Sequence, residues 1–346
     1  MIKFGLVGTG VGGEFIARAL QELRKEGIAE LRAVVGRKPA KTESFAKRFG
    51  ARGWYTSLRD MLSREELDAV AISTPHYLHF PQAVEVMEAG LHVLVDKPMA
   101  INLVEADEMI RLSERKGVKL GVIFEFRFDP DIERMKKLID EGKLGKLIMG
   151  EAVVEWHRPA EYYERSDWRG RWATEGGGAL INQAIHTIDL LLWLMGDVER
   201  LWALVGTFAH DIEVEDLAVA ALKFRSGAFG VIQGSTAIYP GLPTRLEIHG
   251  TEGTLIWEGG SLKMAVVKGE EEVRSGAEAE GLASWARPEA VPIDNHVRLV
   301  RDFAQSIAED RKPRVDGVEG RKSLEIIRAI YLSGRTGHVV ELPLRE

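Results

Sequence analysis

Short, mostly apolar segments alternate with amphipathic segments through the first part of the chain. Ile2–Val7 is a short apolar run, and Glu14–Lys25 carries apolar residues at helical spacing. The same alternation predicts strands over Leu31–Val35, Leu67–Ile72, His92–Val95 and Lys119–Phe124, and helices over Pro39–Phe49, Phe80–Ala89 and Val104–Lys116. Buried strands without polar alternation, each followed by a helix, are typical of a parallel sheet covered on both faces.

The pattern changes after about Phe126. One more helix is predicted over Pro130–Glu141, and the segments that follow alternate apolar and polar residues, as half-buried strands do. These predicted strands are Ile148–Trp156, Glu199–Phe208, Leu217–Phe224, Phe229–Thr236, Arg245–His249 and Thr254–Trp257. The polar segment Gly259–Pro292 predicts a surface loop, and the chain closes with predicted helices over Asn295–Glu309 and Gly317–Gly334.

Two domains are therefore predicted, residues 1–124 and residues 125–346, since 346 residues exceed one typical core. The first is an α/β domain with a parallel sheet. The second is an α/β domain whose sheet is mostly antiparallel.

Composition narrows the class of protein. The net charge is −7 and there is no basic stripe, which argues against nucleic acid as a partner. No segment approaches the roughly 20 apolar residues that span a bilayer, and the first residues lack the pattern of a signal peptide, so we expect a cytoplasmic protein without a membrane partner. Without cysteine, disulfides, thiolate nucleophiles and cysteine-ligated metals are excluded, and we expect no metal site.

A glycine-rich turn joins the first predicted strand to the first helix and matches the GxGxxG pattern. In this context the first glycine permits the tight turn, the second lets the backbone approach a pyrophosphate, and the third lets helix and strand pack closely. The helix N-terminus presents free N–H groups to the phosphates. We expect cofactor contacts from Gly8, Thr9, Gly10, Val11, Gly12 and Gly13. The first domain is thus predicted to be a Rossmann domain that binds NAD or NADP.

The end of the second strand bears on which of the two cofactors binds. Enzymes that use NAD usually carry Asp or Glu there, whereas this chain reads Val35-Gly36-Arg37-Lys38. Arg37 and Lys38 suit the 2′-phosphate of NADP, which we therefore favour over NAD. Alternatively, both are solvated loop cations.

Polar residues follow two further strands of the predicted parallel sheet, at the carboxyl ends where ligands bind. We expect Ser73, Thr74, Pro75, His76 and His79 after one strand, and Asp96 and Lys97 after the next, to contact the cofactor. Pro98 restricts Lys97 to extended geometry. The Lys97 ammonium is then suited to bind a substrate hydroxyl and to stabilise a developing alkoxide.

A second candidate site follows the triple glycine Gly176-Gly177-Gly178. Asn182 and His186 are four residues apart on the predicted helix and share a face, with Asp189 nearby. His186 is suited to take a proton from an alcohol. The alternative is a histidine that simply belongs to the core.

Aromatic and basic residues gather before the triple glycine: Trp156, Arg158, Tyr162, Tyr163, Trp168 and Arg169. Aromatic faces and guanidinium groups suit sugar rings and anionic groups, so Arg158, Trp168 and Arg169 join Lys97, Asn182 and His186 as candidate substrate contacts. A packing cluster is an equal alternative. We interpret His210 and Asp216 as structural.

Taken together, these motifs resemble the glucose–fructose oxidoreductase, inositol dehydrogenase and MocA family along essentially the whole chain. The matching segments are Gly8–Gly13, Thr74-Pro75-His76 with His79, Gly90–Pro98 and Gly176–Asp189. The resemblance implies a Rossmann domain followed by an α/β domain with a large open sheet, whose face mediates homodimers or homotetramers. It also implies oxidation or reduction of a secondary alcohol of a sugar, cyclitol or sugar nucleotide.

By position in the motifs, Lys97 corresponds to the family's catalytic lysine, and His186 corresponds to its catalytic histidine. The lysine stands in Asp-Lys-Pro here, where the family has Glu-Lys-Pro. Asn182 stands where many inositol dehydrogenases have Asp. Since an amide accepts no proton, the base role falls on His186, and Asn182 orients substrate or imidazole. This departure weakens assignment to inositol dehydrogenase itself.

The resulting hypothesis places the substrate hydroxyl between Lys97 and His186, with hydride passing to NAD or NADP. Two alternatives stay open at this point. One is a glycosidase that uses a retained NAD for transient oxidation, and the other is a non-catalytic sensor of the nicotinamide cofactor.

Overall fold

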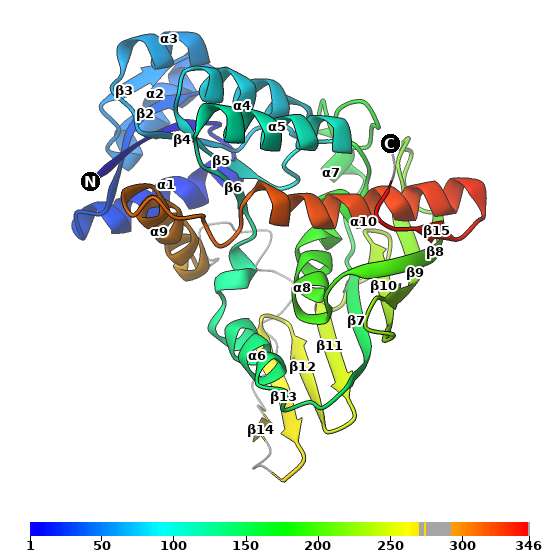
Figure 1. The fold of residues 1–346 in the computed structure, drawn as a ribbon. Coiled ribbons are helices and arrows are strands. Elements are labelled where there is room, and N and C mark those ends of the chain that lie inside the picture. Colours follow the sequence, from blue (N-terminus) through cyan, green and yellow to red (C-terminus); the bar gives the residue numbers. More distant parts are fainter. Residues whose placement is uncertain (270–272, 275–291, 345–346) are drawn as a thin grey trace. The chain divides into compact units, whose positions relative to one another are not determined.

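The structure is a computed structural model that describes residues 1–269, 273–274 and 292–344 (Figure 1). Two compact units make up the chain. The first consists of Met1–Phe128 with Val291–Arg321, and the second of Asp129–Ala290 with Lys322–Glu346.

The first unit is built on a six-stranded sheet in the order β3-β2-β1-β4-β5-β6. Every neighbouring pair of these strands is parallel. The strands are β1 (Ile2–Val7), β2 (Ala29–Val35), β3 (Gly53–Tyr55), β4 (Ala69–Ile72), β5 (His92–Asp96) and β6 (Leu120–Ile123). This order defines the Rossmann fold, and the direction of winding reverses between β1 and β4.

Helices connect the strands of the first unit, and local sequence signals set their ends. They are α1 (Val11–Lys25), α2 (Pro39–Phe49), α3 (Leu58–Arg64), the 3₁₀ turn η1 (His76–Leu78), α4 (His79–Glu88), α5 (Leu103–Lys116) and the 3₁₀ turn η2 (Glu125–Phe128). The Asn102 side chain caps α5 by accepting from the Glu105 N–H at 2.9 Å. Gly50 and Gly117 end α2 and α5 in the left-handed conformation. The sequence patterns missed four short elements of this part of the chain: β3, α3, η1 and η2.

A segment near the end of the chain belongs to the first unit, although the sequence assigned that segment to the second domain. Phe303 of α9 (Asp294–Ala308) lies with its ring 6.2 Å from that of Phe4 in β1. Val122 donates its backbone N–H to Val315 at 3.0 Å. The compact units therefore differ from the predicted boundary after residue 124, because local periodicity carries no signal for a partner so distant in sequence.

The second unit is built on a nine-stranded sheet in the order β14-β13-β12-β11-β7-β10-β9-β8-β15. Only β7 and β10 pair in parallel, so this mixed sheet is mostly antiparallel, as predicted. The strands are β7 (Leu147–Glu155), β8 (Val198–Gly206), β9 (Leu217–Phe224), β10 (Phe229–Ser235), β11 (Arg245–Gly250), β12 (Gly253–Glu258), β13 (Ser261–Val267), β14 (Val273–Arg274) and β15 (Val340–Glu341).

Strands β13 and β14 correct the predicted loop over residues 259–292. The register of β12 and β13 shifts between Ile256 and Trp257, which pair with Met264 and Leu262. Such an irregularity breaks the alternation by which a strand is recognised in sequence. Residues 270–272 and 275–291 of that segment lie outside the described residues.

Helices complete the second unit. They are α6 (Pro130–Asp140), the short α7 (Glu161–Glu164), the π-helical turn η3 (Leu180–Ala184), α8 (Ile185–Met195) and the part of α10 (Gly317–Thr336) that follows Lys322. Of these, α6, η3 and α8 contact the sheet of this unit. A Cβ atom at Gly150 of β7 would lie 2.8 Å from Leu191 of α8, which shows how closely α8 packs on the sheet.

Apolar side chains of β8, β9 and β10 are exposed: Trp202, Leu204, Val219 and Phe229. The homodimer or homotetramer that the resemblance implies stays a prediction.

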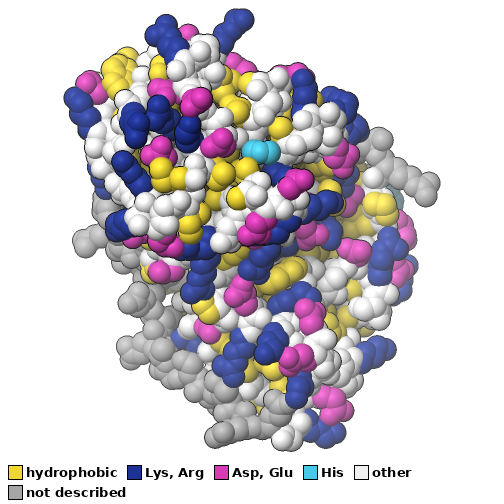
Figure 2. Space-filling model, turned by 60° about the vertical axis from the view of Figure 1, so that its left-hand side comes forward, with side chains coloured by type: hydrophobic (Ala, Val, Ile, Leu, Met, Phe, Trp, Pro, Cys, Tyr) yellow, Lys and Arg dark blue, Asp and Glu magenta, His cyan; other side chains and the backbone are white. Residues whose placement is uncertain are grey.

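Among the described residues, none of the helices combines the length and the apolar character needed to cross a bilayer. On the face shown in Figure 2, Lys and Arg side chains are interspersed with Asp and Glu over the described residues.

Candidate active site

The glycine turn between β1 and α1 fits a dinucleotide pyrophosphate. Gly8 has φ of 115°, and a Cβ atom there would lie 1.9 Å from the Ser73 carbonyl oxygen. A Cβ at Gly13 would lie 2.3 Å from the Gly8 carbonyl oxygen, so Gly13 permits the close packing of helix on strand. At Gly10, the N-cap of α1, a Cβ would meet nothing within 4 Å and no side chain caps the helix. This leaves open space at the helix N-terminus, where anions bind.

The carboxyl ends of β1, β4 and β5 converge beside this turn. A Cβ at Gly12 would lie 2.3 Å from Ser73 Oγ and 2.6 Å from Asp96 Oδ2. Ser73 Oγ donates to Asp96 Oδ2 at 2.8 Å, and the Lys97 backbone N–H donates to Asp96 Oδ1 at 2.8 Å. Asp96 therefore links the glycine turn to the backbone that carries Lys97.

His79 holds two of the predicted site segments together. Its Nδ1 and Nε2 atoms lie 2.8 Å from the carbonyl oxygens of Pro98 and Thr74 respectively, and the ring is fully buried. Burial lowers the pKa of His79, an effect opposed by the nearby Asp96 carboxylate. Both ring nitrogens thus serve the main chain, so His79 shapes the site through the backbone of Thr74 and Pro98. His76 is also buried, and the centroids of the His76 and His79 rings lie 5.9 Å apart.

Arg37 and Lys38 are exposed and lie just after the end of β2. Lys38 is the N-cap residue of α2 and makes no side-chain cap. The position suits recognition of a ribose substituent, while the cofactor contact itself stays a prediction.

Packing inside the second unit explains two glycines of the triple glycine, Gly177 and Gly178. A Cβ at Gly178 would lie 1.9 Å from the Glu215 carbonyl oxygen, and one at Gly177 would lie 2.1 Å from the Tyr331 hydroxyl oxygen. The buried Glu215 carboxylate accepts the N–H groups of Gly178 and Leu180 at 2.8 Å each. These contacts, which sequence reasoning missed, fix the start of the helix.

Asn182 and His186 lie on consecutive turns of different type. Asn182 belongs to the π-helical turn η3, and His186 to the first turn of α8. The sequence predicted one regular helix here. A π-helical turn within a helix is rare and occurs frequently at functional sites, so this difference supports the site.

Two arginines stack on Tyr162. The guanidinium carbons of Arg158 and Arg169 lie 5.3 Å and 4.4 Å from its ring centroid. Each arginine also lies near a tryptophan. The guanidinium carbon of Arg158 is 5.0 Å from the ring centroid of Trp156, and that of Arg169 is 4.9 Å from the ring centroid of Trp168. The Nε atom of each arginine is buried without a hydrogen-bond partner among the described residues. Burial raises the pKa of Tyr162, and the two guanidinium groups oppose this shift.

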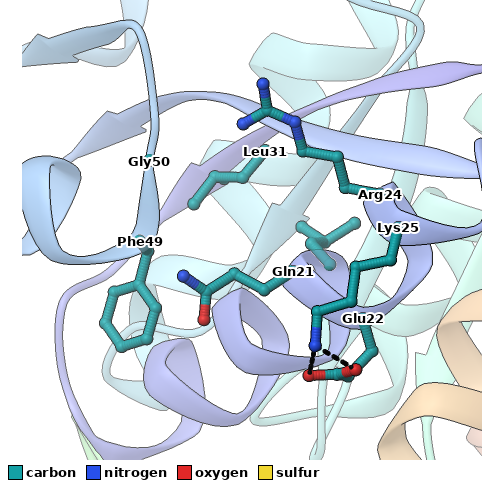
Figure 3. A pocket seen from close by; sticks show the side chains of 8 residues that line it. Gln21, Glu22, Arg24, Lys25, Leu31, Phe49 and Gly50 are labelled. Carbon is teal, nitrogen blue, oxygen red and sulfur yellow. Dashed lines mark hydrogen bonds and ion pairs between the residues drawn. The ribbon is translucent and has the colours of Figure 1, made fainter.

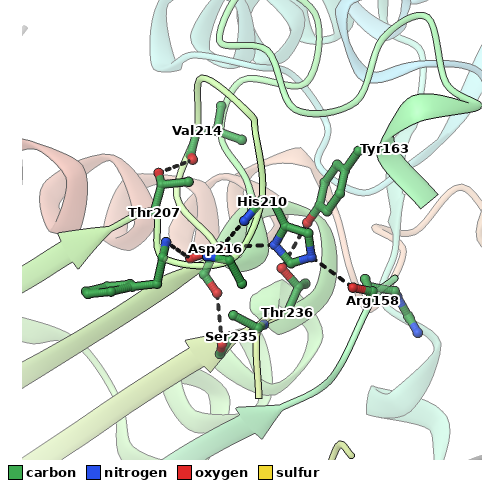
Figure 4. Close-up of polar contacts among 11 residues, drawn as sticks. Arg158, Tyr163, Thr207, His210, Val214, Asp216, Ser235 and Thr236 are labelled. Atoms are coloured by element: carbon green, nitrogen blue, oxygen red, sulfur yellow. Dashed lines mark hydrogen bonds and ion pairs between the residues drawn. The ribbon is translucent and has the colours of Figure 1, made fainter. Parts of the chain in front are cut away.

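A buried pair fixes the main chain at Arg158 (Figure 4). His210 Nδ1 lies 2.9 Å from Asp216 Oδ2, and His210 Nε2 lies 2.8 Å from the Arg158 carbonyl oxygen. Asp216 also accepts the backbone N–H groups of Phe208 and Ala209 at 2.8 Å each. These contacts give His210 and Asp216 a structural role beside the arginine cluster.

A surface depression of about 400 Å³ lies along the C-terminal half of α1, bordered by Phe49 and Gly50 (Figure 3). Lys25 reaches both carboxylate oxygens of Glu22 there, at 2.8 Å and 2.7 Å. Since none of the predicted site residues lines it, the depression is separate from the glycine turn.

The Rossmann topology, the glycine turn and the polar strand ends define a nicotinamide-dinucleotide-dependent oxidoreductase with a second, mixed α/β domain. Comparison with known proteins identifies the family. Residues 2–124 match the oxidoreductase family with an NAD-binding Rossmann fold, and residues 132–256 match the GFO/IDH/MocA C-terminal domain. The chain belongs to the GFO/IDH/MocA family and is an NAD(P)-dependent oxidoreductase.

Three relatives illustrate the range of proteins that this chain resembles. The WlbA dehydrogenase from Bordetella pertussis, solved in complex with NADH and UDP-GlcNAcA, is 35% identical with a TM-score of 0.87, covering 99% of each chain. D-apiose dehydrogenase from Paraburkholderia graminis is 28% identical over 98% of this chain and 89% of its own. The scyllo-inositol 2-dehydrogenase (NADP⁺) of Bacillus subtilis is 26% identical over 99% and 96%.

Proposed function

We propose that the protein interconverts a secondary alcohol and a ketone on a sugar, cyclitol or sugar nucleotide, with Lys97 and His186 acting at the reacting oxygen. The observation that carries this proposal is the convergence of the ends of β1, β4 and β5, which joins the glycine turn through Ser73 and Asp96 to Lys97. A nicotinamide held at these strand ends would supply the hydride acceptor and donor for the substrate carbon.

The residues of the chain handle the proton and the charge on oxygen. The Lys97 ammonium donates a hydrogen bond to the substrate hydroxyl and stabilises negative charge as it develops there. His186 accepts the hydroxyl proton as the carbonyl forms and returns it in the reverse direction, since imidazole exchanges protons near neutral pH.

The substrate in this proposal carries an anionic group, which Arg158 and Arg169 bind. Arg158 and Arg169 are half-buried, and the buried Nε atom of each has no hydrogen-bond partner among the described residues. Two partly desolvated cations favour a negatively charged ligand, which would pair with them. Tyr162 holds both guanidinium groups by stacking. The UDP-GlcNAcA bound to the WlbA relative supports an acidic sugar nucleotide as the first candidate.

The cofactor preferred in this proposal is NADP. Gly36, rather than an acid, follows β2, and the next two residues, Arg37 and Lys38, are both exposed. The NADH in the WlbA complex favours the other cofactor, so both are included in the test.

The experiment assays purified protein with NAD⁺ and with NADP⁺ against UDP-GlcNAcA, UDP-GlcNAc, scyllo-inositol and D-apiose, following the absorbance of reduced nicotinamide. We expect turnover that requires added cofactor and is fastest with UDP-GlcNAcA. Glycoside cleavage without added cofactor would contradict the proposal in favour of a retained-NAD glycosidase. Cofactor binding without any turnover across the panel would favour a sensor.

A further inference from the structure

Glu175 is a buried acid that the proposed chemistry has not used so far. It lies directly before the triple glycine and is 1% exposed. Its Oε2 accepts the backbone N–H of Gly170 at 2.5 Å, and its Oε1 accepts the side-chain Nδ2 of Asn182 at 2.5 Å. The carboxylate therefore joins the loop before the glycines to the π-helical turn that carries Asn182.

The contact with Glu175 decides which end of the Asn182 amide points where. An ionised carboxylate only accepts hydrogen bonds, so the amide atom facing it must be the nitrogen. The flipped amide would place two oxygens in contact. The Tyr162 hydroxyl oxygen, 3.4 Å from the same nitrogen, adds a second acceptor on that side. Oδ1 of Asn182 thus points away from Glu175.

The same contact ties Asn182 to the arginine cluster. Tyr162, on which Arg158 and Arg169 stack, accepts a hydrogen bond from Gln183 Nε2 at 3.0 Å. Asn182 and Gln183 are adjacent in η3, one turn before His186. One polar network therefore connects Glu175, the amide of Asn182 and the aromatic ring that holds the two cations.

We infer that Glu175 is a positioning residue for the reaction: it orients Asn182 so that the amide oxygen accepts a hydrogen bond from a substrate hydroxyl. Two groups on one helix, Asn182 and His186, then hold the substrate while only His186 exchanges a proton with it. This inference rests on the proposed alcohol–ketone interconversion. It makes Asn182 a hydrogen-bond acceptor for the substrate, whereas the sequence left open whether Asn182 orients the substrate or the imidazole.

The test exchanges the two functional groups. In E175Q, the Gly170 N–H needs an acceptor and therefore holds the oxygen of the new amide, so the amide nitrogen faces Asn182. The Asn182 oxygen then turns toward position 175, and position 182 no longer presents an acceptor to the substrate. In N182D, two carboxylates face each other and cannot both be ionised, so one holds a proton. In the double variant E175Q/N182D, the amide nitrogen donates to the carboxylate, and position 182 again presents an acceptor oxygen.

We expect kcat with UDP-GlcNAcA to fall at least about tenfold in E175Q and about a hundredfold in N182D, since misplacing a reactant by an ångström can cost that much. N182D should also gain an ionisation in its pH–rate profile that the wild type lacks. The double variant should recover to within about fivefold of the wild type, because the two positions act as one coupled pair. The KM of the cofactor should stay unchanged in all three.

E213Q serves as the matched control, because Glu213 is exposed and its carboxylate contacts the backbone of Trp172 rather than Asn182. Melting temperatures of all variants separate folding from function. A double variant no faster than the product of the two single effects overturns the inference, as does E175Q with wild-type kcat and pH profile. A wild type inactive with the whole panel overturns the proposed function itself, and the role of Glu175 in the reaction with it.

Discussion

The Tyr331 hydroxyl donates a hydrogen bond to Glu215 Oε1 at 2.9 Å, and both side chains are buried. Tyr331 lies in α10, and Glu215 lies in the segment before β9. The same carboxylate accepts the N–H groups of Gly178 and Leu180. This relationship fixes the start of the helix that carries Asn182 and His186, so the state of Glu215 matters for stability.

Stability is expected to depend on pH through Glu215. Burial raises the pKa of Glu215 from 4.5 to about 7, opposed by the hydrogen bonds of Leu180 and Tyr331. Because the folded state holds this proton more tightly, the contribution to stability is fully present below the unfolded value of 4.5 and is lost as pH rises through about 7. A shift of this size corresponds to about 3 kcal/mol.

Urea unfolding of wild type and E215Q across this pH range measures the effect. The wild-type free energy of unfolding should fall relative to that of E215Q as pH rises. Y331F removes a donor that favours the charged form, so its loss of stability should extend to higher pH. Parallel curves for wild type and E215Q would show that Glu215 does not titrate in this range.

Loss of Lys97 or His186 is expected to affect turnover rather than cofactor binding. K97M and H186A should each lower kcat by about 10²–10⁴-fold, the usual contribution of a group that handles a proton in the transition state. Cofactor affinity, followed by fluorescence titration, should change little. K116M, which removes a surface lysine paired with Glu88, is the control. Either variant with wild-type kcat would remove that residue from the mechanism.

Cofactor preference is expected to depend on Arg37. R37A should raise the KM of NADP⁺ about tenfold and leave that of NAD⁺ nearly unchanged, because a charge-assisted hydrogen bond contributes about 1.5–3 kcal/mol. R52A, at an exposed arginine of the same unit, is the control. A wild type that strongly prefers NAD⁺ would show that Arg37 does not bind a 2′-phosphate.

Arg158 and Arg169 are expected to bind the carboxylate on the sugar of UDP-GlcNAcA. R158M and R169M keep the aliphatic stem, yet they should raise the KM of UDP-GlcNAcA at least about tenfold, since a charged hydrogen bond is lost. The KM of UDP-GlcNAc should change much less. R171M, at the exposed Arg171, is the control. Equal losses with both nucleotides would place the arginines on the pyrophosphate, and no loss with either would make the cluster a packing element.

The sequence by itself determined the Rossmann half in considerable detail. Ile2–Val7 and Pro39–Phe49 were predicted with the bounds that the structure shows, and most other elements to within a few residues. The glycine turn was recognisable because each glycine meets a local requirement, such as the positive φ of Gly8. Local periodicity and local backbone geometry are properties of neighbouring residues, so the sequence carries them directly.

Only the tertiary structure decided how distant residues combine. Residues 292–321 belong to the first unit and contact it through Phe303 and Val315, although nothing in their own sequence pattern predicts Phe4 or Val122 as partners. The acids Glu175 and Glu215 drew no attention in the sequence, because a single Glu is usually a solvated charge. Their importance follows from burial and from the hydrogen bonds that they accept. Glu175 accepts one from Asn182, and Glu215 accepts hydrogen bonds from Gly178, Leu180 and Tyr331. Burial and long-range hydrogen bonding depend on how the whole chain packs, and no local pattern encodes them.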